Sequence, residues 1–435
     1  MSQIVWDNIL ATSYLLMWVG TLFWYQYKSR RIDGGTAIMA TYILYAIFSL
    51  ITLNDDMFNS LYNPLEFLPY LFLYGMLMIA LSPAIYTHLH PATSIEEPHS
   101  RILSFLALVI IACSILIIPY IVENFSSGIV KLFIESDAGK EAYMEQSLEA
   151  ADAGFGISNI PAIIFNAMSD LTVFLCFYFL TLKKRNIWLI IGLSLSIVVS
   201  VLVPIIQGAR GNVIAAVFTM IVGYMMFREY IEKKVNRVVQ IVGLSFLIAT
   251  TLPVTAITVS RFGDMGGGIG GFLNWYVGQG SIYFNNYAFD TGGTRNGDRI
   301  LNLPKRAIDP TTPKNYVERR DKYHNLNIDD YFFTTFVGDF IIDFGIVLTV
   351  IIFIAFNLYV ILRIRSRDGT LKLYQVLLLY FSLCICMQGG MTLFPYSDNA
   401  NLRVFVIFSL YIYLRYHDKL LEKFPQEKRQ NEEVP

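Results

Sequence analysis

Arginine residues stand between or at the ends of long apolar runs at three places in this sequence. Arg210 lies in "PIIQGARGNV", Arg261 in "ITVSRFGD" and Arg403 in "SDNANLRVF". A guanidinium group in or near hydrocarbon is costly unless it is paired or lies in a wet cavity. Its planar N–H donors fit phosphate and carboxylate groups. The three residues predict a site for a lipid diphosphate, a phospholipid headgroup or an acidic sugar, and interfacial anchoring is the alternative for Arg210.

Carboxylates lie inside apolar runs as well. Asp339 and Asp343 in "TTFVGDFIIDFG" are four residues apart and share one helical face, and Asp170 lies in "NAMSDLTVF". Intramembrane carboxylates usually have a function and a basic partner. The alternative is structural, with these carboxylates pairing with the arginines and holding the helices together.

His324 is the only histidine predicted to face outward, and a histidine that titrates near neutral pH suits a general base. Tyr276 lies in "NWYVGQGSIYFNNYAF", which predicts a re-entrant or interfacial helix. Its aromatic rings and amides suit sugar rings, and an aromatic belt at headgroup level is the alternative.

The sequence predicts no cofactor. His88 and His90, with the more distant His99, form only a weak metal pattern, so we expect no metal site. The four cysteines all lie inside apolar runs, where they are expected to pack as small apolar side chains.

The composition indicates a membrane protein. Of the 435 residues, 55% are hydrophobic and 15% are charged, and the mean hydropathy is +0.50. Soluble domains carry about 25% charged residues. The net charge of −1 gives no reason to expect a nucleic-acid partner.

The apolar runs predict an all-α polytopic protein, because a membrane-spanning helix needs about 20 mostly apolar residues. We expect about eleven such helices in one integral membrane domain, 1–435. Their predicted ranges are 8–27, 35–53, 67–87, 102–122, 160–182, 187–206, 212–227, 238–259, 336–362, 371–389 and 401–416.

Basic clusters in alternate loops predict the orientation. If the eleven segments alternate, most of the 33 Lys and Arg residues lie on one side, which is expected to be cytoplasmic. The N-terminus is then periplasmic, and the tail 417–435 is cytoplasmic. Two long outer loops, 123–159 and 260–335, carry the remaining mass, and long loops of this kind are often functional.

With these features, the sequence resembles bacterial oligosaccharide repeat unit polymerases, the Wzy-type O-antigen and capsule polymerases. The resemblance rests on "QGARGN" opening a span, "SRFG" ending one, the large outer loop and "TTFVGDFIIDFG" after it. It implies a membrane glycosyltransferase C-like fold in the bacterial inner membrane. It also implies polymerisation of undecaprenyl-diphosphate-linked oligosaccharides at the periplasmic face, with release of undecaprenyl diphosphate.

The resemblance implies roles for the candidate residues. Arg210, Arg261 and Arg403 would bind the diphosphate, and Asp170 would lie among the substrate-binding groups. His324 would act as the base that activates the acceptor hydroxyl, with Asp343 or Asp339 next in order. Tyr276 would line the sugar groove. The expected partners are the lipid-linked oligosaccharide, membrane lipid and a chain-length regulator protein.

Three alternatives remain open. An O-antigen ligase would share the fold and the donor and would differ only in the acceptor. A flippase or other transporter would favour paired halves and broken helices, and no two-half symmetry is visible in the sequence. The third is a membrane acyltransferase or a non-enzymatic lipid-binding protein. An acyltransferase would be expected to place a histidine deep in a span, and no predicted span contains one.

Overall fold

Helices occupy all eleven apolar ranges in the computed structural model of the protein, which describes residues 3–98, 101–134, 159–262, 268–328, 332–366, 368–391 and 398–423. One of these ranges, 160–182, holds two helices, α6 and α7. The helices are α1 (Gln3–Ser29), α2 (Gly34–Leu53), α3 (Phe67–Leu89), α4 (Ile102–Ile134), α6 (Ile160–Ala167), α7 (Ser169–Thr181), α8 (Ile187–Ile206), α9 (Arg210–Phe227), α10 (Lys233–Phe262), α14 (Phe336–Ile364), α15 (Leu373–Gln388) and α16 (Asp398–Lys423).

The length and composition of these helices confirm a helical membrane protein. Among the described residues, seven helices are long and apolar enough to cross a bilayer, and α6 with α7 make an eighth if the bent pair is one span. The helix α15 is apolar but has only 16 residues. The number eleven therefore stays a prediction, and so does the glycosyltransferase C-like fold.

The predicted loop bounds change at two places. The helix α4 continues to Ile134, twelve residues beyond its predicted end, so the first part of the 123–159 loop is helical. The helix α16 continues to Lys423 and includes the start of the predicted tail 417–435. Residues 135–158, the rest of the first outer loop, lie outside the described part of the chain.

Much of the long 260–335 loop is folded. The predicted helix over 274–289 is present as α11 (Gly268–Tyr283) followed by the π-helical turn η3 (Phe284–Ala288). Single turns of π-helix are often found at functional sites. Two short helices, α12 (Asn302–Ile308) and α13 (Tyr316–Lys322), follow, and a 3-10 turn, η1 (Asn59–Leu61), lies in the loop between α2 and α3.

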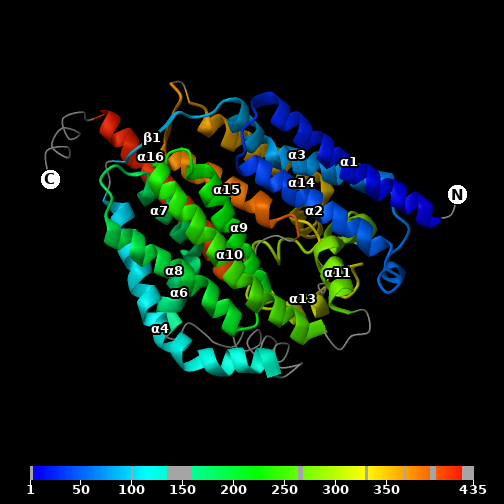
Figure 1. Ribbon diagram of the computed structural model, residues 1–435. Helices are drawn as coiled ribbons and strands as arrows, with labels where there is room; N and C mark the ends of the chain where they lie inside the picture. The colour runs from blue at the N-terminus through cyan, green and yellow to red at the C-terminus, as the bar shows by residue number, and fades with distance from the viewer. Residues whose placement is uncertain are drawn as a thin grey trace.

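The helix α11 packs closely against α2. A Cβ on Gly278 would lie 2.5 Å from the Phe48 backbone, so only glycine allows this approach. The Ser49 hydroxyl lies 2.9 Å from the Ser281 hydroxyl at the same contact. Figure 1 shows α1 and α2 on one side of the bundle, α4 and α8 on the opposite side, and α9 and α15 between them. The outer loop is thereby joined to the membrane helices.

Two of the helical ranges are broken. The axes of α6 and α7 meet at a bend of 58°, and Asp170 lies in the first turn of α7. The helix α14 is interrupted at Gly345, where φ is 76° and ψ is 168°. These angles are essentially restricted to glycine. Asp343 lies two residues before this break.

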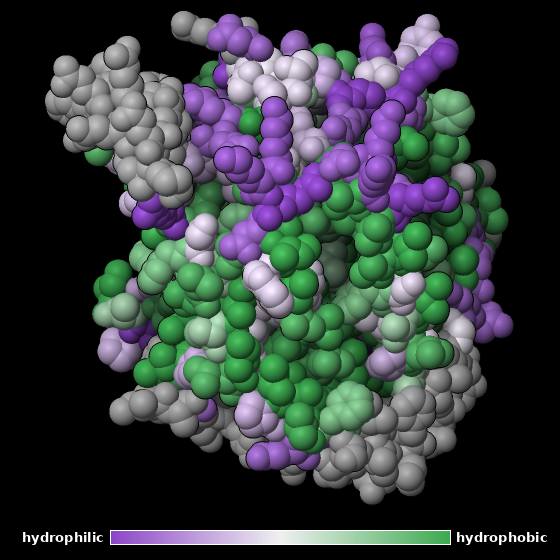
Figure 2. All heavy atoms as spheres, turned by 60° about the vertical axis from the view of Figure 1, so that its left-hand side comes forward, coloured by the Kyte–Doolittle hydropathy of each residue, from purple (hydrophilic) through white to green (hydrophobic). Residues whose placement is uncertain are grey.

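The basic loops gather at one end of the molecule, which we call the basic end. Arg31 pairs with Glu229, and Arg185 with Glu232, so three loops meet there. The loop 90–98 reaches the same end through a parallel ladder of β1 (Ser94–Glu96) and β2 (Thr370–Lys372). Figure 2 shows hydrophilic side chains gathered at one end of the face in view, above a hydrophobic band.

Candidate functional site: an arginine in an apolar cavity

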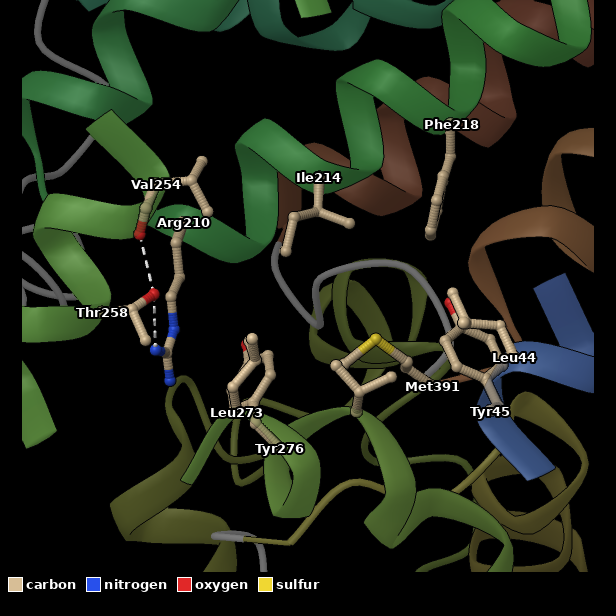
Figure 3. Close-up of a pocket in the computed structure, with 11 residues that line it drawn as sticks. Leu44, Tyr45, Arg210, Ile214, Phe218, Val254, Thr258, Leu273, Tyr276 and Met391 are labelled. Atoms are coloured by element: carbon tan, nitrogen blue, oxygen red, sulfur yellow. Dashed lines mark hydrogen bonds between the residues drawn. The ribbon is translucent and has the colours of Figure 1, made fainter. Parts of the chain in front are cut away.

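A cavity of about 140 Å³ lies between α2, α9, α10 and α11. Figure 3 shows Arg210 pointing into it from the first turn of α9, between Thr258 of α10 and Tyr276 of α11. The other lining residues are mostly apolar, namely Leu44, Tyr45, Ile214, Phe218, Val254, Leu273, Val277 and Met391. Among the described residues, the cavity therefore combines one cationic group with mostly apolar walls.

Local sequence sets the position of Arg210. Gly208 has a φ of 63°, which lets the chain reverse directly after α8. Ala209 is the N-cap residue of α9, so Arg210 is the first residue of that helix. Residues 210, 214 and 218 then recur on one helical face, and all three line the cavity. The N-terminus of α9 adds a partial positive charge at the same place.

Arg210 is 5% exposed and is held by two neighbours. Its guanidinium carbon lies 4.0 Å from the centroid of the Tyr276 ring, and one terminal nitrogen donates to Thr258 Oγ1 at 3.3 Å. A desolvated cation–π contact contributes about 2 kcal/mol, which offsets part of the cost of burying the charge. Tyr276, which was predicted to line a sugar groove, lies in the cavity lining with its ring facing Arg210.

The exposed lining residues are apolar. Leu44 is 47% exposed and Leu273 is 44% exposed, whereas Arg210 and Thr258 are each 5% exposed. The cavity lining thus combines exposed apolar residues with a buried cation. An amphiphile with an anionic group and an apolar tail matches this arrangement.

Arg403 belongs to a different cluster. Its Nε donates to the carbonyl oxygen of Asn166 at 3.0 Å, and its charge acts on Asp170. Arg403 is not among the lining residues of the cavity in the described part of the chain. Its electrostatic attraction to Asp170 fits the structural alternative stated above.

The two carboxylates of α14 face the outer loop. Asp339 and Asp343 are fully buried, and Asp339 pairs with Arg299 at 3.2 Å. Asp343 accepts the backbone N–H groups of Arg299 at 3.1 Å and Ile300 at 2.6 Å. The structural alternative named Arg210, Arg261 or Arg403 as partners, and the partner found for Asp339 is Arg299. Complete burial with these bonds favours a structural role for Asp339 and Asp343.

A third ionic cluster lies in the same loop and is centred on Asp298, the residue before Arg299. Asp298 is fully buried, and it accepts hydrogen bonds from Lys305, Lys322 at 2.7 Å and the Tyr323 hydroxyl at 2.6 Å. Burial raises the pKa of Asp298, but the bonds from Lys305, Lys322 and Tyr323 outweigh it, so the pKa is lowered below its ordinary value. Asp298 is therefore ionised and ties α12 to α13.

His324 and Arg261 are the two remaining candidate residues, and neither is among the described residues that line the cavity. His324 is exposed after α13, and its Nδ1 lies 2.8 Å from the carbonyl oxygen of Asp321. It does not line the cavity. Arg261 falls in the last turn of α10, and its side chain lies outside the described residues. The roles predicted for His324 and Arg261 stay predictions.

The amides of the predicted sugar groove already have partners. Asn285 bonds to the backbone of Glu66 through both its oxygen, at 2.9 Å, and its nitrogen, at 2.7 Å. Asn286 does the same with Asn63, at 3.1 Å for each bond. The two side chains fasten the loop before α3 to η3, so they are engaged in structure rather than aimed at solvent.

The sequence pattern did not predict that three arginines of the 260–335 loop are buried. Arg295, Arg299 and Arg319 are 1%, 6% and 3% exposed, although their segment reads as a solvated loop. The one sequence signal is the pair of carboxylates in "GDFIID", which required basic partners that this segment could supply.

His88, which was weighed above as part of a weak metal pattern, is hydrogen-bonded at the basic end of the molecule. His88 Nδ1 lies 2.6 Å from Asp33 Oδ2, and its Nε2 lies 2.8 Å from the carbonyl oxygen of Tyr25 and 2.6 Å from the Ser29 hydroxyl. Both ring nitrogens have hydrogen-bond partners, and the arrangement cross-links α1, α2 and α3.

No family model, curated protein or solved structure matches the chain. The class that the fold and site define is a polytopic helical membrane protein with a buried arginine in an apolar cavity.

Proposed function

We propose that the protein is a membrane glycosyltransferase that polymerises polyprenyl-diphosphate-linked oligosaccharide repeat units at the periplasmic face of the bacterial inner membrane. The observation that carries this proposal is the cavity, which is lined by the buried Arg210 and by apolar residues, two of them exposed. A polyprenyl diphosphate is an anion joined to a long hydrocarbon chain, so each part of it has a matching surface there.

The chemistry needs a cation more than any other group. The acceptor hydroxyl oxygen attacks the anomeric carbon of the donor glycan, and the bond from that carbon to the diphosphate oxygen breaks. The diphosphate leaves with the electron pair, and the hydroxyl proton passes to a base. Arg210 and the N-terminus of α9 would stabilise the negative charge that develops on the leaving group.

The remaining residues take supporting roles. Tyr276 and Thr258 hold the Arg210 guanidinium in place, because they contact its carbon and its terminal nitrogen. The pairs formed by Asp339 and Asp343 hold the outer loop on α14, above the membrane helices. His324, as the exposed histidine of this loop, is proposed as the base.

A transporter of lipid-linked oligosaccharides is the second candidate, and one observation favours it. Both broken helices carry a carboxylate beside the break, Asp170 in α7 and Asp343 in α14. Discontinuous helices with polar groups near the break occur at the substrate and ion sites of transporters. An O-antigen ligase shares the chemistry proposed above and differs in its acceptor.

The test uses a strain that lacks the protein and carries single-residue variants. In Arg210→Ala, we expect the yield of long-chain surface polysaccharide to fall about 10- to 100-fold, the loss expected when a charge-assisted bond to phosphate is removed. Arg210→Lys keeps the charge without the planar stack on Tyr276 and should retain part of the activity. The readout is the ladder of glycan lengths, beside the amount of protein in the membrane.

The control is Lys314→Ala, which removes one exposed charge from the outer loop. It should leave the ladder unchanged. A normal ladder in Arg210→Ala would contradict the site. The deletion strain separates the classes: single repeat units still attached to their final acceptor indicate a polymerase, loss of all attachment indicates a ligase, and repeat units held on the inner leaflet indicate a transporter.

A further inference from the structure

Three loops of the basic end form one continuous surface, which we call the basic seam: residues 28–33, 182–186 and 228–237. Arg31 pairs with Glu229, and Arg185 bonds to Glu232 at 3.1 Å. Arg228 donates to the carbonyl oxygen of Ile32, which joins the first loop to the third a second time. Loops that are distant in sequence are therefore held side by side.

The basic seam carries a large surplus of positive charge. Ten Lys and Arg residues stand against three carboxylates in these loops. Two of the carboxylates, Glu229 and Glu232, are already paired with arginines of the seam. The closest segment alongside, 90–98, adds Glu96 and Glu97, which leaves the surplus positive. The exposed cations are Lys28, Arg30, Lys183, Lys184, Lys233, Lys234 and Arg237.

Large aromatic side chains lie directly beside these cations and point outward. Tyr27, next to Lys28, is 81% exposed, and Trp188, at the start of α8 beyond Lys184, is 78% exposed. Ile187 beside it is 57% exposed. An exposed Trp or Tyr at the end of an apolar helix is placed at the level of the lipid headgroups. The cations of the seam and these rings thus lie at the same depth.

We propose that the basic seam is a binding site for anionic phospholipid headgroups, with Lys183 and Lys184 contacting the phosphate and Trp188 lying at the boundary of headgroup and acyl chain. An acidic protein would also be attracted by the charge. The exposed Trp188, Ile187 and Tyr27 favour a lipid, because large apolar and aromatic side chains at the ends of apolar helices suit the boundary of headgroup and acyl chain. This inference does not depend on the chemistry proposed for the cavity.

Trp188 is a reporter at the site itself. The full-length protein is placed in phosphatidylcholine vesicles that contain increasing fractions of brominated phosphatidylglycerol or, in a parallel series, of brominated phosphatidylcholine, and bromine quenches the fluorescence of a contacting tryptophan. The Trp188→Phe variant, measured in parallel, isolates the Trp188 signal from the other four tryptophans. We expect phosphatidylglycerol to be enriched severalfold over phosphatidylcholine at Trp188, and the enrichment to fall at high salt.

The double variant Lys183→Gln/Lys184→Gln should lower the enrichment of phosphatidylglycerol toward one, because each basic residue near a membrane surface strengthens the attraction of anionic lipid. The variant Lys233→Gln/Lys234→Gln should reduce it as well. Lys314→Gln/Lys419→Gln removes two exposed lysines outside the seam and should keep the enrichment. Equal quenching by both lipids in the wild type, or unchanged enrichment in Lys183→Gln/Lys184→Gln, would overturn the proposal.

Discussion

Two arginines of this protein offset the cost of burial in different ways. Arg299 pairs with a carboxylate, Asp339, at 3.2 Å. Arg210 stacks on the Tyr276 ring, bonds to the Thr258 hydroxyl and lines the cavity. Removing one partner of a buried ion pair typically costs about 3–5 kcal/mol, so substitutions in the Arg299 pair should act mainly on folding. Arg210 is the residue at which binding can be tested.

Asp298 gives a prediction for acid stability. Its pKa is lowered in the folded protein by the bonds from Lys305, Lys322 and Tyr323, which outweigh burial. The unfolded chain therefore binds the proton more tightly, so the stability due to Asp298 is present at neutral pH. It is lost as the pH falls below the ordinary value of about 3.9 toward the folded-state pKa. Asp298→Asn should be less stable than the wild type at neutral pH.

The measurement is the thermal midpoint of the purified protein in detergent, from about pH 6 to about pH 3. The difference between the wild type and Asp298→Asn should narrow as the pH falls, because the other carboxylates are common to both proteins. A difference that stays constant over this range would show that Asp298 does not titrate in the way its contacts indicate.

At the scale of the helices, the break in α14 determines where the outer loop attaches. The loop caps the first part of α14, since the N–H of Arg295 donates to the carbonyl oxygen of Ile342 at 2.9 Å. The N–H of Gly297 donates to the carbonyl oxygen of Asp343 at 3.2 Å. A continuous helix would use these carbonyl groups itself. The break therefore frees the acceptors that hold the loop.

Gly345→Ala tests this element. A Cβ at residue 345 would lie 3.5 Å from Thr294, which is ordinary contact, so the cost comes from the backbone angles. We expect a loss of about 1–3 kcal/mol in the free energy of unfolding. Gly20→Ala is the matched control: a Cβ there meets nothing within 4 Å, and alanine favours a helix interior. Equal effects of the two substitutions would contradict the role assigned to Gly345.

The sequence predicts the helices better than their breaks. Each apolar run is a local property, and the structure has helices in all eleven ranges. The break at Gly345 is invisible in the apolar pattern, because Phe344 and Ile346 continue it. Arg210 and Tyr276 were both named as site residues, but their stacking depends on the packing of α9 against α11. The burial of Arg295 likewise depends on contacts with α14, far along the chain.

At the scale of the molecule, the loops divide between two ends. Asn63, fastened to Asn286, lies at the end opposite the basic seam, and Lys184 lies within the seam. The excess of Lys and Arg predicts that the basic end is cytoplasmic.

Single cysteines test this orientation, since the four native cysteines are buried. In intact cells, a membrane-impermeant maleimide should label Asn63→Cys and should label Lys184→Cys only after the inner membrane is disrupted. Labelling of Lys184→Cys in intact cells, with Asn63→Cys protected, would reverse the predicted orientation.

The short ladder between β1 and β2 joins residues that are made far apart in time. Ser94 pairs with Thr370, and Lys372 at its end pairs with Asp418. While the ribosome is still translating the middle of the chain, the residues after α3 have no strand to bond with. Final closure of the loops at the basic end thus waits until α14 has been made, and a chain truncated before Thr370 should leave β1 unpaired and open to proteolysis.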